Sequence, residues 1–131
     1  MVEVVAAVIM RDEKVLICQR KRGGRHPLKW EFPGGKVEFG EDLRAALARE
    51  LREELNIEAT IGEELDSYEV RYEDDFGLTL HFYRVTHFHG EPSNQDFEQI
   101  VWERPEKLQE YDFLEGDVIF LSKLARGPEA E

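Results

Sequence analysis

Apolar residues recur along the chain with two spacings, one typical of strands and the other typical of helices. A continuous apolar run at 2–10 predicts a buried strand, and the run at 15–18, which follows a polar turn, predicts its hairpin partner. Beyond the middle of the chain, further strands are expected at 59–61, 65–72 and 78–88.

The longest helix is expected at 42–55, which contains no glycine, proline or β-branched residue. Its leucines recur every fourth residue and form an apolar stripe of Leu43, Leu47, Leu51 and Leu55. A helical turn from Pro105 and a closing helix at 118–124 follow later. These strands and helices indicate an α+β fold, but the periodicity alone does not arrange them into layers.

Three glutamates lie on or beside the apolar stripe of this helix, namely Glu50, Glu53 and Glu54. Carboxylates one turn apart repel each other, and partial burial would add a desolvation cost or raise their pKa values. A bound divalent cation would remove both costs, and oxygen ligands favour Mg²⁺. The alternative is a solvated acidic face whose charge is balanced by Arg49 and Arg52. The position of the glutamates beside the buried stripe favours the metal site.

The segment 35–57 resembles the Nudix box, G-x5-E-x7-R-E-U-x-E-E-x-G-U, in which U is a bulky aliphatic residue. The matching residues are Gly35, Glu41, Arg49, Glu50, Leu51, Glu53, Glu54 and Ile57. Asn56 stands where the family has glycine, and asparagine is the next-best residue for a left-handed backbone after a helix. The resemblance implies an α/β/α sandwich with a central mixed sheet, forming one domain at 1–126 with a tail at 127–131.

The resemblance also implies a metal site and its catalytic residues. The expected ligands of Mg²⁺, or of Mn²⁺ as a substitute, are the Gly35 carbonyl, Glu50, Glu53, Glu54 and the loop residue Asp96. The expected catalytic residues are Glu53, Glu50, Asp96 and Arg49, with Glu53 or Asp96 as the general base. Asp96 precedes Trp102 by six residues, the spacing common in MutT-like relatives, and Glu98 is the reserve. Glu41, expected in the first helical turn with Asp42, has either a supporting or ligating role or none beyond starting the helix.

Substrate-binding residues are expected on both sides of the box. The cationic segment 20–25 is either a solvated loop or a triphosphate clamp, and Arg20 is the best phosphate-binding candidate because MutT-like relatives have an arginine there. The segment 30–36 resembles the MutT-type lead-in and contributes Phe32 and Lys36, although Lys36 could simply be an exposed lysine. Asp117 occupies the place of a base-contacting Asn or Asp. It could instead cap the last helix.

Composition limits the classes of function. A net charge of −12 over 131 residues argues against general binding to nucleic acids or anionic membranes, but not against a nucleotide held with metal ions. The single cysteine, Cys18, lies in an apolar run and is expected in the core rather than as a nucleophile. A zinc site is possible at His81, His87 and His89, which would share one strand face, but rim positions are favoured. No apolar run has the length of a membrane span, so a cytoplasmic location is expected.

The MutT-like flanks imply Mg²⁺-dependent hydrolysis of a (deoxy)nucleoside triphosphate to a monophosphate and pyrophosphate, as in nucleotide pool sanitation. An ionised Asp117 only accepts hydrogen bonds, which favours cytosine or a guanine-type edge, as in CTP or 8-oxo-dGTP. Two alternatives stay open. One is hydrolysis of another nucleoside diphosphate conjugate, such as ADP-ribose, a nucleotide sugar or a dinucleoside polyphosphate. The other is a nucleotide sensor without catalysis. The protein is expected to be a monomer or a homodimer.

Overall fold

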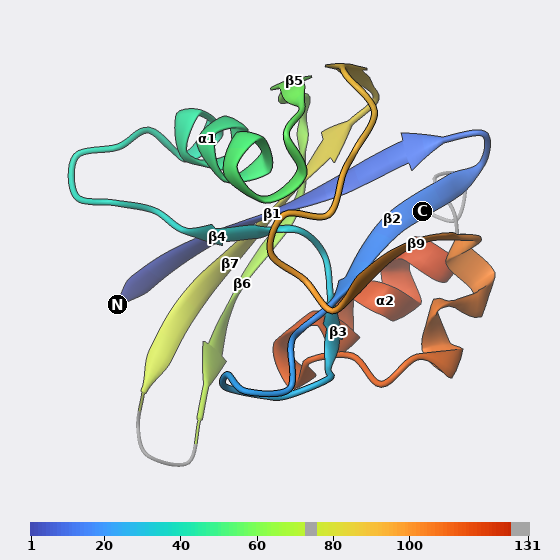
Figure 1. Cartoon of the computed structure of the whole chain (residues 1–131). Helices are drawn as coiled ribbons and strands as arrows, with labels where there is room; N and C mark the ends of the chain where they lie inside the picture. The colour runs from blue at the N-terminus through green and yellow to red at the C-terminus, as the bar shows by residue number, and fades with distance from the viewer. Residues whose placement is uncertain (73–75, 127–131) are drawn as a thin grey trace.

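A mixed sheet forms the centre of the computed structural model, which describes residues 1–72 and 76–126 (Figure 1). The elements in chain order are β1 (Val2–Arg11), β2 (Lys14–Gln19), β3 (Trp30–Glu31), β4 (Gly34–Lys36), α1 (Leu43–Leu55), β5 (Glu58–Thr60), β6 (Glu64–Arg71), β7 (Gly77–Val85), β8 (His87–His89), β9 (Gln99–Glu103), the 3₁₀ helix η1 (Pro105–Glu110) and α2 (Glu115–Arg126). The expected tail at 127–131 lies outside the described residues. Within the described residues, no helix has the length and apolar content needed to cross a membrane.

The strand β1 changes antiparallel partners along its length. Its first half pairs with β4, where Val4 lies opposite Lys36, and its end forms the expected hairpin with β2. Its other edge pairs in parallel with β7 from Val2 to Ile9, which makes the sheet mixed. The sheet order is β3-β2-β1-β7-β6, with β4 added to β1 and β9 added to β2. The hydrophobic pattern did not predict the two short strands, β4, which pairs with β1, and β3, which pairs with β2.

Both faces of β1 are buried, so its apolar run does not alternate with polar residues. Val5, Ala7 and Ile9 pack in a core with α1, whereas Ala6 and Val8 pack in a second core that contains Phe120 of α2. The two helices lie on opposite faces of the sheet (Figure 1). The expected α/β/α sandwich is therefore confirmed.

The ends of α1 show why the helix begins and stops where it does. The side chain of Asp42 accepts hydrogen bonds from the backbone N–H groups of Arg44 and Ala45, so Asp42 is the N-cap. Asn56 has φ 57° and ψ 40°, which confirms the expected left-handed residue after the helix. The expectation that Glu41 and Asp42 lie in the first helical turn was wrong, because the cap places both before Leu43.

Two other expected boundaries were wrong. The single strand expected at 78–88 is divided at Thr86, so β7 belongs to the main sheet and β8 pairs, within the described part of the chain, with β5 alone. The three histidines therefore do not share one strand face, and His81 instead lies 2.6 Å from a carboxylate oxygen of Glu3. The last helix begins at Glu115 rather than at residue 118, so Asp117 is a residue of its first turn and not its N-cap.

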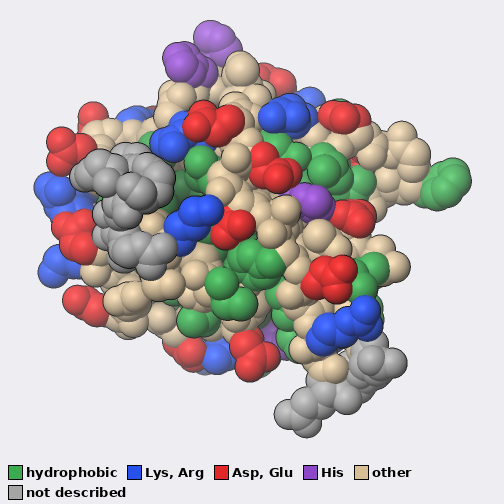
Figure 2. Space-filling model, turned by 180° about the vertical axis from the view of Figure 1, so that it is seen from behind, with side chains coloured by type: hydrophobic (Ala, Val, Ile, Leu, Met, Phe, Trp, Pro, Cys, Tyr) green, Lys and Arg blue, Asp and Glu red, His purple; other side chains and the backbone are tan. Residues whose placement is uncertain are grey.

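Acidic and basic side chains lie among one another on the face opposite to that of Figure 1 (Figure 2). Among the described side chains of that face, cations do not form a continuous stripe. A nucleic-acid backbone requires such a stripe for strong electrostatic binding.

Candidate active site

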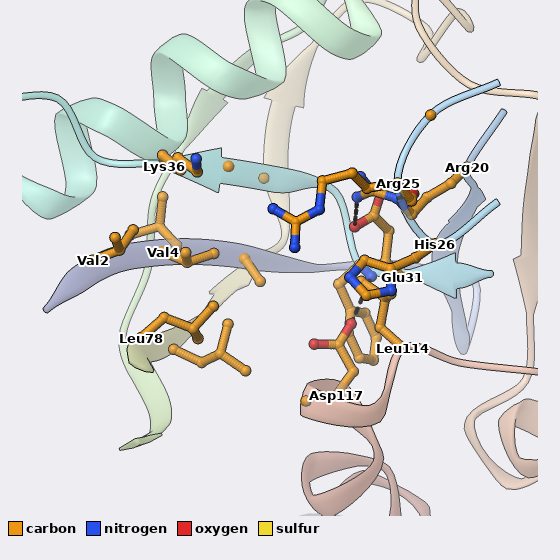
Figure 3. Close-up of a pocket in the computed structure, with 18 of the residues that line it drawn as sticks. Val2, Val4, Arg20, Arg25, His26, Glu31, Lys36, Leu78, Leu114 and Asp117 are labelled. Atoms are coloured by element: carbon orange, nitrogen blue, oxygen red, sulfur yellow. Dashed lines mark hydrogen bonds and ion pairs between the residues drawn. The ribbon is translucent and has the colours of Figure 1, made fainter. Parts of the chain in front are cut away.

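A cavity of about 1240 Å³ lies beside the edge of β1, where β4 replaces β2. Its wall contains residues from β1, β4, α1 and β7, from the loop between β2 and β3, and from the start of α2 (Figure 3). Most of the residues expected at the site line this single cavity, namely Arg20, Phe32, Gly35, Lys36, Glu50, Glu54, Asp96 and Asp117. Segments far apart in sequence therefore form one site.

The acidic end of the cavity is formed by α1 and β4. Burial of Leu47, Leu51 and Leu55 fixes the rotation of α1, and this turns Glu50 and Glu54 toward β4. The Glu54 carboxylate accepts a hydrogen bond of 3.1 Å from the Gly34 N–H. A Cβ atom at Gly35 would lie 2.5 Å from Cδ of Glu50, so only glycine leaves room for this carboxylate.

The pKa values of these two carboxylates are both raised. Burial, followed by the charges of Glu50 and Glu31, raises the pKa of Glu54 from 4.5 to about 9. Burial also raises the pKa of Glu50, although the nearby guanidinium of Arg49 opposes the change. A cation at this end would offset both effects.

The donor set at this end suits a hard cation that keeps other ligands. Within residues 1–72 and 76–126, no three His, Cys, Asp or Glu side chains converge closely enough to hold an ion by themselves. Backbone carbonyl, water and phosphate oxygens would have to complete the coordination, which is typical of Mg²⁺ sites. The cradle at Gly35 and the like-charged carboxylates therefore fit a divalent metal.

Arg49 and Glu53 lie outside the cavity wall. The guanidinium of Arg49 donates to both carboxylate oxygens of Glu41 at 2.7 and 3.0 Å, and it also contacts Glu50 and Glu53 at 3.3 Å. Its Nη2 also donates to the Lys36 carbonyl at 3.2 Å, which ties α1 to β4. This bonding lowers the pKa of Glu41 to about 2 and raises that of Arg49. Arg49 and Glu41 thus orient the acidic end, whereas the Glu53 side chain is 59% exposed.

The loop before β9 brings a further carboxylate to the cavity. Asp96 lines the wall, but the reserve candidate Glu98 does not. Asn94 shapes this loop, because its Oδ1 accepts from the N–H groups of Asp96 and Phe97 and its Nδ2 donates to the Phe97 carbonyl. The Gln95 N–H also donates to the Glu54 carbonyl, which fixes the loop to the end of α1.

The opposite end of the cavity contains Asp117, which is only 5% exposed. It accepts a hydrogen bond of 3.4 Å from the Phe32 N–H, and burial, followed by the charge of Glu31, raises its pKa to about 7. A carboxyl with this pKa is present in both forms near neutral pH: the ionised form only accepts hydrogen bonds, as expected, and the protonated form can also donate. The Phe32 ring packs against Phe82 and Phe120, so it forms a rigid wall.

Arg20 and Lys36 lie on opposite sides of the cavity. Nη1 of Arg20 donates to both oxygens of Glu31 at 3.1 and 3.3 Å, and its Nε donates to the Arg25 carbonyl at 2.9 Å. The Lys36 side chain is exposed at the acidic end (Figure 3).

The sequence interpretation missed Glu31, although it lines the cavity between Asp117 and Glu54. Burial raises its pKa, and Arg20 opposes the change. The sequence signal was a single acidic residue between two aromatic residues. Trp30 and Phe32 are both buried, and the alternation of a strand places Glu31 on the opposite side from them. Cys18, in contrast, is fully buried with its pKa raised by burial, as expected for a core residue.

Comparisons with known proteins bear on the family and the fold of this chain. The family model of the NUDIX domain matches residues 1–124. The chain is 43% identical over 121 residues to a CTP pyrophosphohydrolase of Escherichia coli K12, covering 92% of this chain and 89% of that protein. It is 32% identical over 124 residues to an 8-oxo-dGTP diphosphatase of the same organism, covering 93% and 95%. The solution structure of the E. coli ORF135 protein superposes with a TM-score of 0.87 at 41% identity, covering 100% of this chain and 95% of that chain.

Proposed function

The chain belongs to the Nudix family, and on this premise we propose that it is a nucleoside triphosphate pyrophosphohydrolase. The reaction converts a nucleoside triphosphate and water to a nucleoside monophosphate and pyrophosphate. The single observation that carries the proposal is one cavity with buried carboxylates at one end and the buried Asp117 at the other. This cavity has room for the phosphate chain and the base together.

Nudix hydrolases generally use a divalent metal, and we propose Mg²⁺ for this chain, with Mn²⁺ as a substitute. The Gly35 carbonyl and the carboxylates of Glu50, Glu53, Glu54 and Asp96 would hold it. When bound, such an ion neutralises phosphate charge and lowers the pKa of a coordinated water. Arg49 keeps Glu50 and Glu53 oriented on one side of α1, which preorganises the site.

The protein supplies the proton acceptor and the wall around the reacting phosphates. Glu53 or Asp96 is the proposed general base, because each is a carboxylate near the acidic end that can accept a proton from water. Lys36 and the cationic segment 20–25 provide positive charge near the phosphates. Such charge stabilises the pyrophosphate as it leaves.

Asp117 is the proposed base-contacting residue, and it can donate or accept according to its protonation. Its two forms suit the edge of cytosine or of an oxidised guanine, which the names of the two E. coli relatives make the first bases to test. Other diphosphate conjugates and a non-catalytic sensor are not favoured, since these named relatives act on nucleoside triphosphates. A cytoplasmic location and a monomeric or homodimeric state stay predictions.

A panel of substrates tests the proposal. We expect CTP, dCTP, dGTP or 8-oxo-dGTP with MgCl₂ to yield pyrophosphate and a monophosphate, detected separately, and ADP-ribose and a nucleotide sugar to react at least ~100-fold more slowly in kcat/KM. Glu54→Gln should lower turnover by roughly 100-fold, whereas Glu58→Gln, an exposed residue outside the cavity, should not. Two monophosphates from ADP-ribose as the main reaction would contradict the proposed substrate class.

A further inference from the structure

Three cationic side chains line the cavity without any ion pair or side-chain hydrogen bond among the described residues, namely Lys21, Arg25 and Lys36. Many other cations of the chain are paired with carboxylates, among them Arg11, Lys29, Arg52, Arg84, Arg104 and Lys123. The chain carries a net charge of −12, so acidic partners are abundant. Arg22, outside the wall, also has no ion pair among the described residues, so it is the place of the three cations on one cavity wall that favours an anion there.

Arg20 differs from these three because its guanidinium is already engaged. Its Nη1 pairs with the Glu31 carboxylate, and its Nε donates to the Arg25 carbonyl at 2.9 Å. Backbone bonds at both edges, from Arg20 N–H to the Lys29 carbonyl and from Leu28 N–H to the Arg20 carbonyl, close the same loop. Arg20 thus fixes the backbone position from which the Arg25 side chain extends.

The Arg25 side chain projects from this loop into the cavity, above β1 and on the side where β4 carries Lys36 (Figure 3). It lies between the carboxylate end and the Asp117 end, where the phosphates of a nucleotide spanning the cavity would pass. Next to it, the pKa of His26 is lowered by burial and then by Arg20, Arg25 and Lys29, so several cations lie close together in this loop. A guanidinium also binds two phosphate oxygens at once, which suits this position.

We propose that Arg25 binds the phosphate chain of the substrate and that Arg20 is a positioning residue that acts through the Arg25 carbonyl. This inference rests on the proposed function, since it concerns the same cavity and the same triphosphate. It reassigns the phosphate contact within segment 20–25 from the arginine at the strand end to the one in the loop. Arg20 then serves the substrate indirectly.

The first test compares Arg25→Ala with Arg22→Ala, a control that removes an exposed cation of the same loop outside the cavity wall. We expect Arg25→Ala to raise KM for CTP and 8-oxo-dGTP about tenfold, with kcat within about threefold and the ranking of bases unchanged. The Kd of a non-hydrolysable α,β-methylene triphosphate should rise by a similar factor, whereas Arg22→Ala should stay within about twofold.

Two results of this test would overturn the proposal. One is a KM and Kd within twofold of wild type for Arg25→Ala. The other is a changed ranking of bases, which would place Arg25 against the base. Failure of the proposed function is recognised separately, because wild-type protein would then release no pyrophosphate from any triphosphate in the panel.

The second test concerns Arg20. Lysine keeps the positive charge, but its single ammonium group cannot form both hydrogen bonds of the guanidinium, one to Glu31 and one to the Arg25 carbonyl. We expect Arg20→Lys to raise the Kd of the analogue about fivefold, and to add less than this factor when Arg25→Ala is already present. Near-normal binding by Arg20→Lys together with weak binding by Arg20→Ala would show that Arg20 itself contacts phosphate, which contradicts the positioning role.

Discussion

At the scale of single residues, burial changes the pKa of Asp117. The sequence indicated a place for this residue in the site but gave no information on its burial. The carboxyl is nearly inaccessible, accepts one long hydrogen bond from the Phe32 N–H, and has a pKa of about 7. Ionised at this place, it would lack the hydrogen bonds that water provides. The residue that is proposed to contact the base is therefore also a source of instability.

This leads to a prediction for stability against pH. Because the folded-state pKa is raised from 3.8 to about 7, the unfolded chain loses this proton first, and Asp117 should lower the free energy of unfolding progressively between these values. At pH 8 the cost is roughly 4 kcal/mol, at about 1.4 kcal/mol for each tenfold change in the protonation equilibrium. Asp117→Asn should remove this cost, so its advantage over wild type in urea unfolding should be small at pH 4 and largest above pH 7. Parallel pH profiles of the two proteins would contradict the assignment.

At the scale of elements, the short strand β4 combines two glycines with different constraints. A Cβ at Gly34, where φ is 152°, would lie 2.0 Å from the Val5 carbonyl oxygen of the neighbouring strand. A Cβ at Gly35 would meet the end of the flexible Glu50 side chain. The first glycine is required by the pairing of β4 with β1, and the second by the carboxylate beside it.

Alanine at each of these positions should therefore have a different effect. We expect Gly34→Ala to lower the free energy of unfolding by about 3 kcal/mol, because backbone atoms must move. Gly35→Ala should cost only about 1 kcal/mol but lower kcat/KM at least tenfold, because Glu50 is displaced from its cradle. Urea unfolding and pyrophosphate release measure the two effects, and full activity in Gly35→Ala would exclude the proposed role of this position.

The sequence predicted the elements whose signals are local. The leucine spacing and the left-handed Asn56 define most of α1 without any tertiary information, although the role of Asp42 as the N-cap was not predicted. The division of the expected strand 78–88 was not predictable in this way, since Thr86 and its neighbours continue the alternation and only the partner strand β5 separates β8. The Nudix resemblance identified the acidic end. The relation between Arg20, Glu31 and Arg25 depends on how the loop between β2 and β3 folds against β3, and no spacing in the sequence encodes it.

At the scale of the whole molecule, the acidic end of the cavity adds to a chain that already carries a charge of −12. Repulsion between carboxylates destabilises the folded state, and it acts on the buried Glu54, whose pKa is raised by burial and also by Glu50, Glu31 and Asp96. A ligand that binds only the folded chain at this place should stabilise the whole domain.

We therefore expect Mg²⁺ to raise the melting temperature. At 100 times its Kd the ion should add about 2.7 kcal/mol, which corresponds to a shift of several degrees for a domain of this size. Glu54→Gln should lose most of this shift, and EDTA should reverse it in wild type. Sodium chloride at matched ionic strength is the control, and an equal shift with sodium would mean that general screening is responsible.

The parallel pairing of β1 with β7 has a consequence during synthesis. Strand β1 has two apolar faces and leaves the ribosome well before its partner β7, which begins only at Gly77, while β2 must wait for β9 at Gln99–Glu103. Until then the nascent hairpin exposes surface that other chains can contact, a stage at which chaperones act. The residues that line the cavity extend along the chain from Val2 to Asp117. A chain released from the ribosome before the start of α2 therefore lacks part of this wall and should not bind nucleotide.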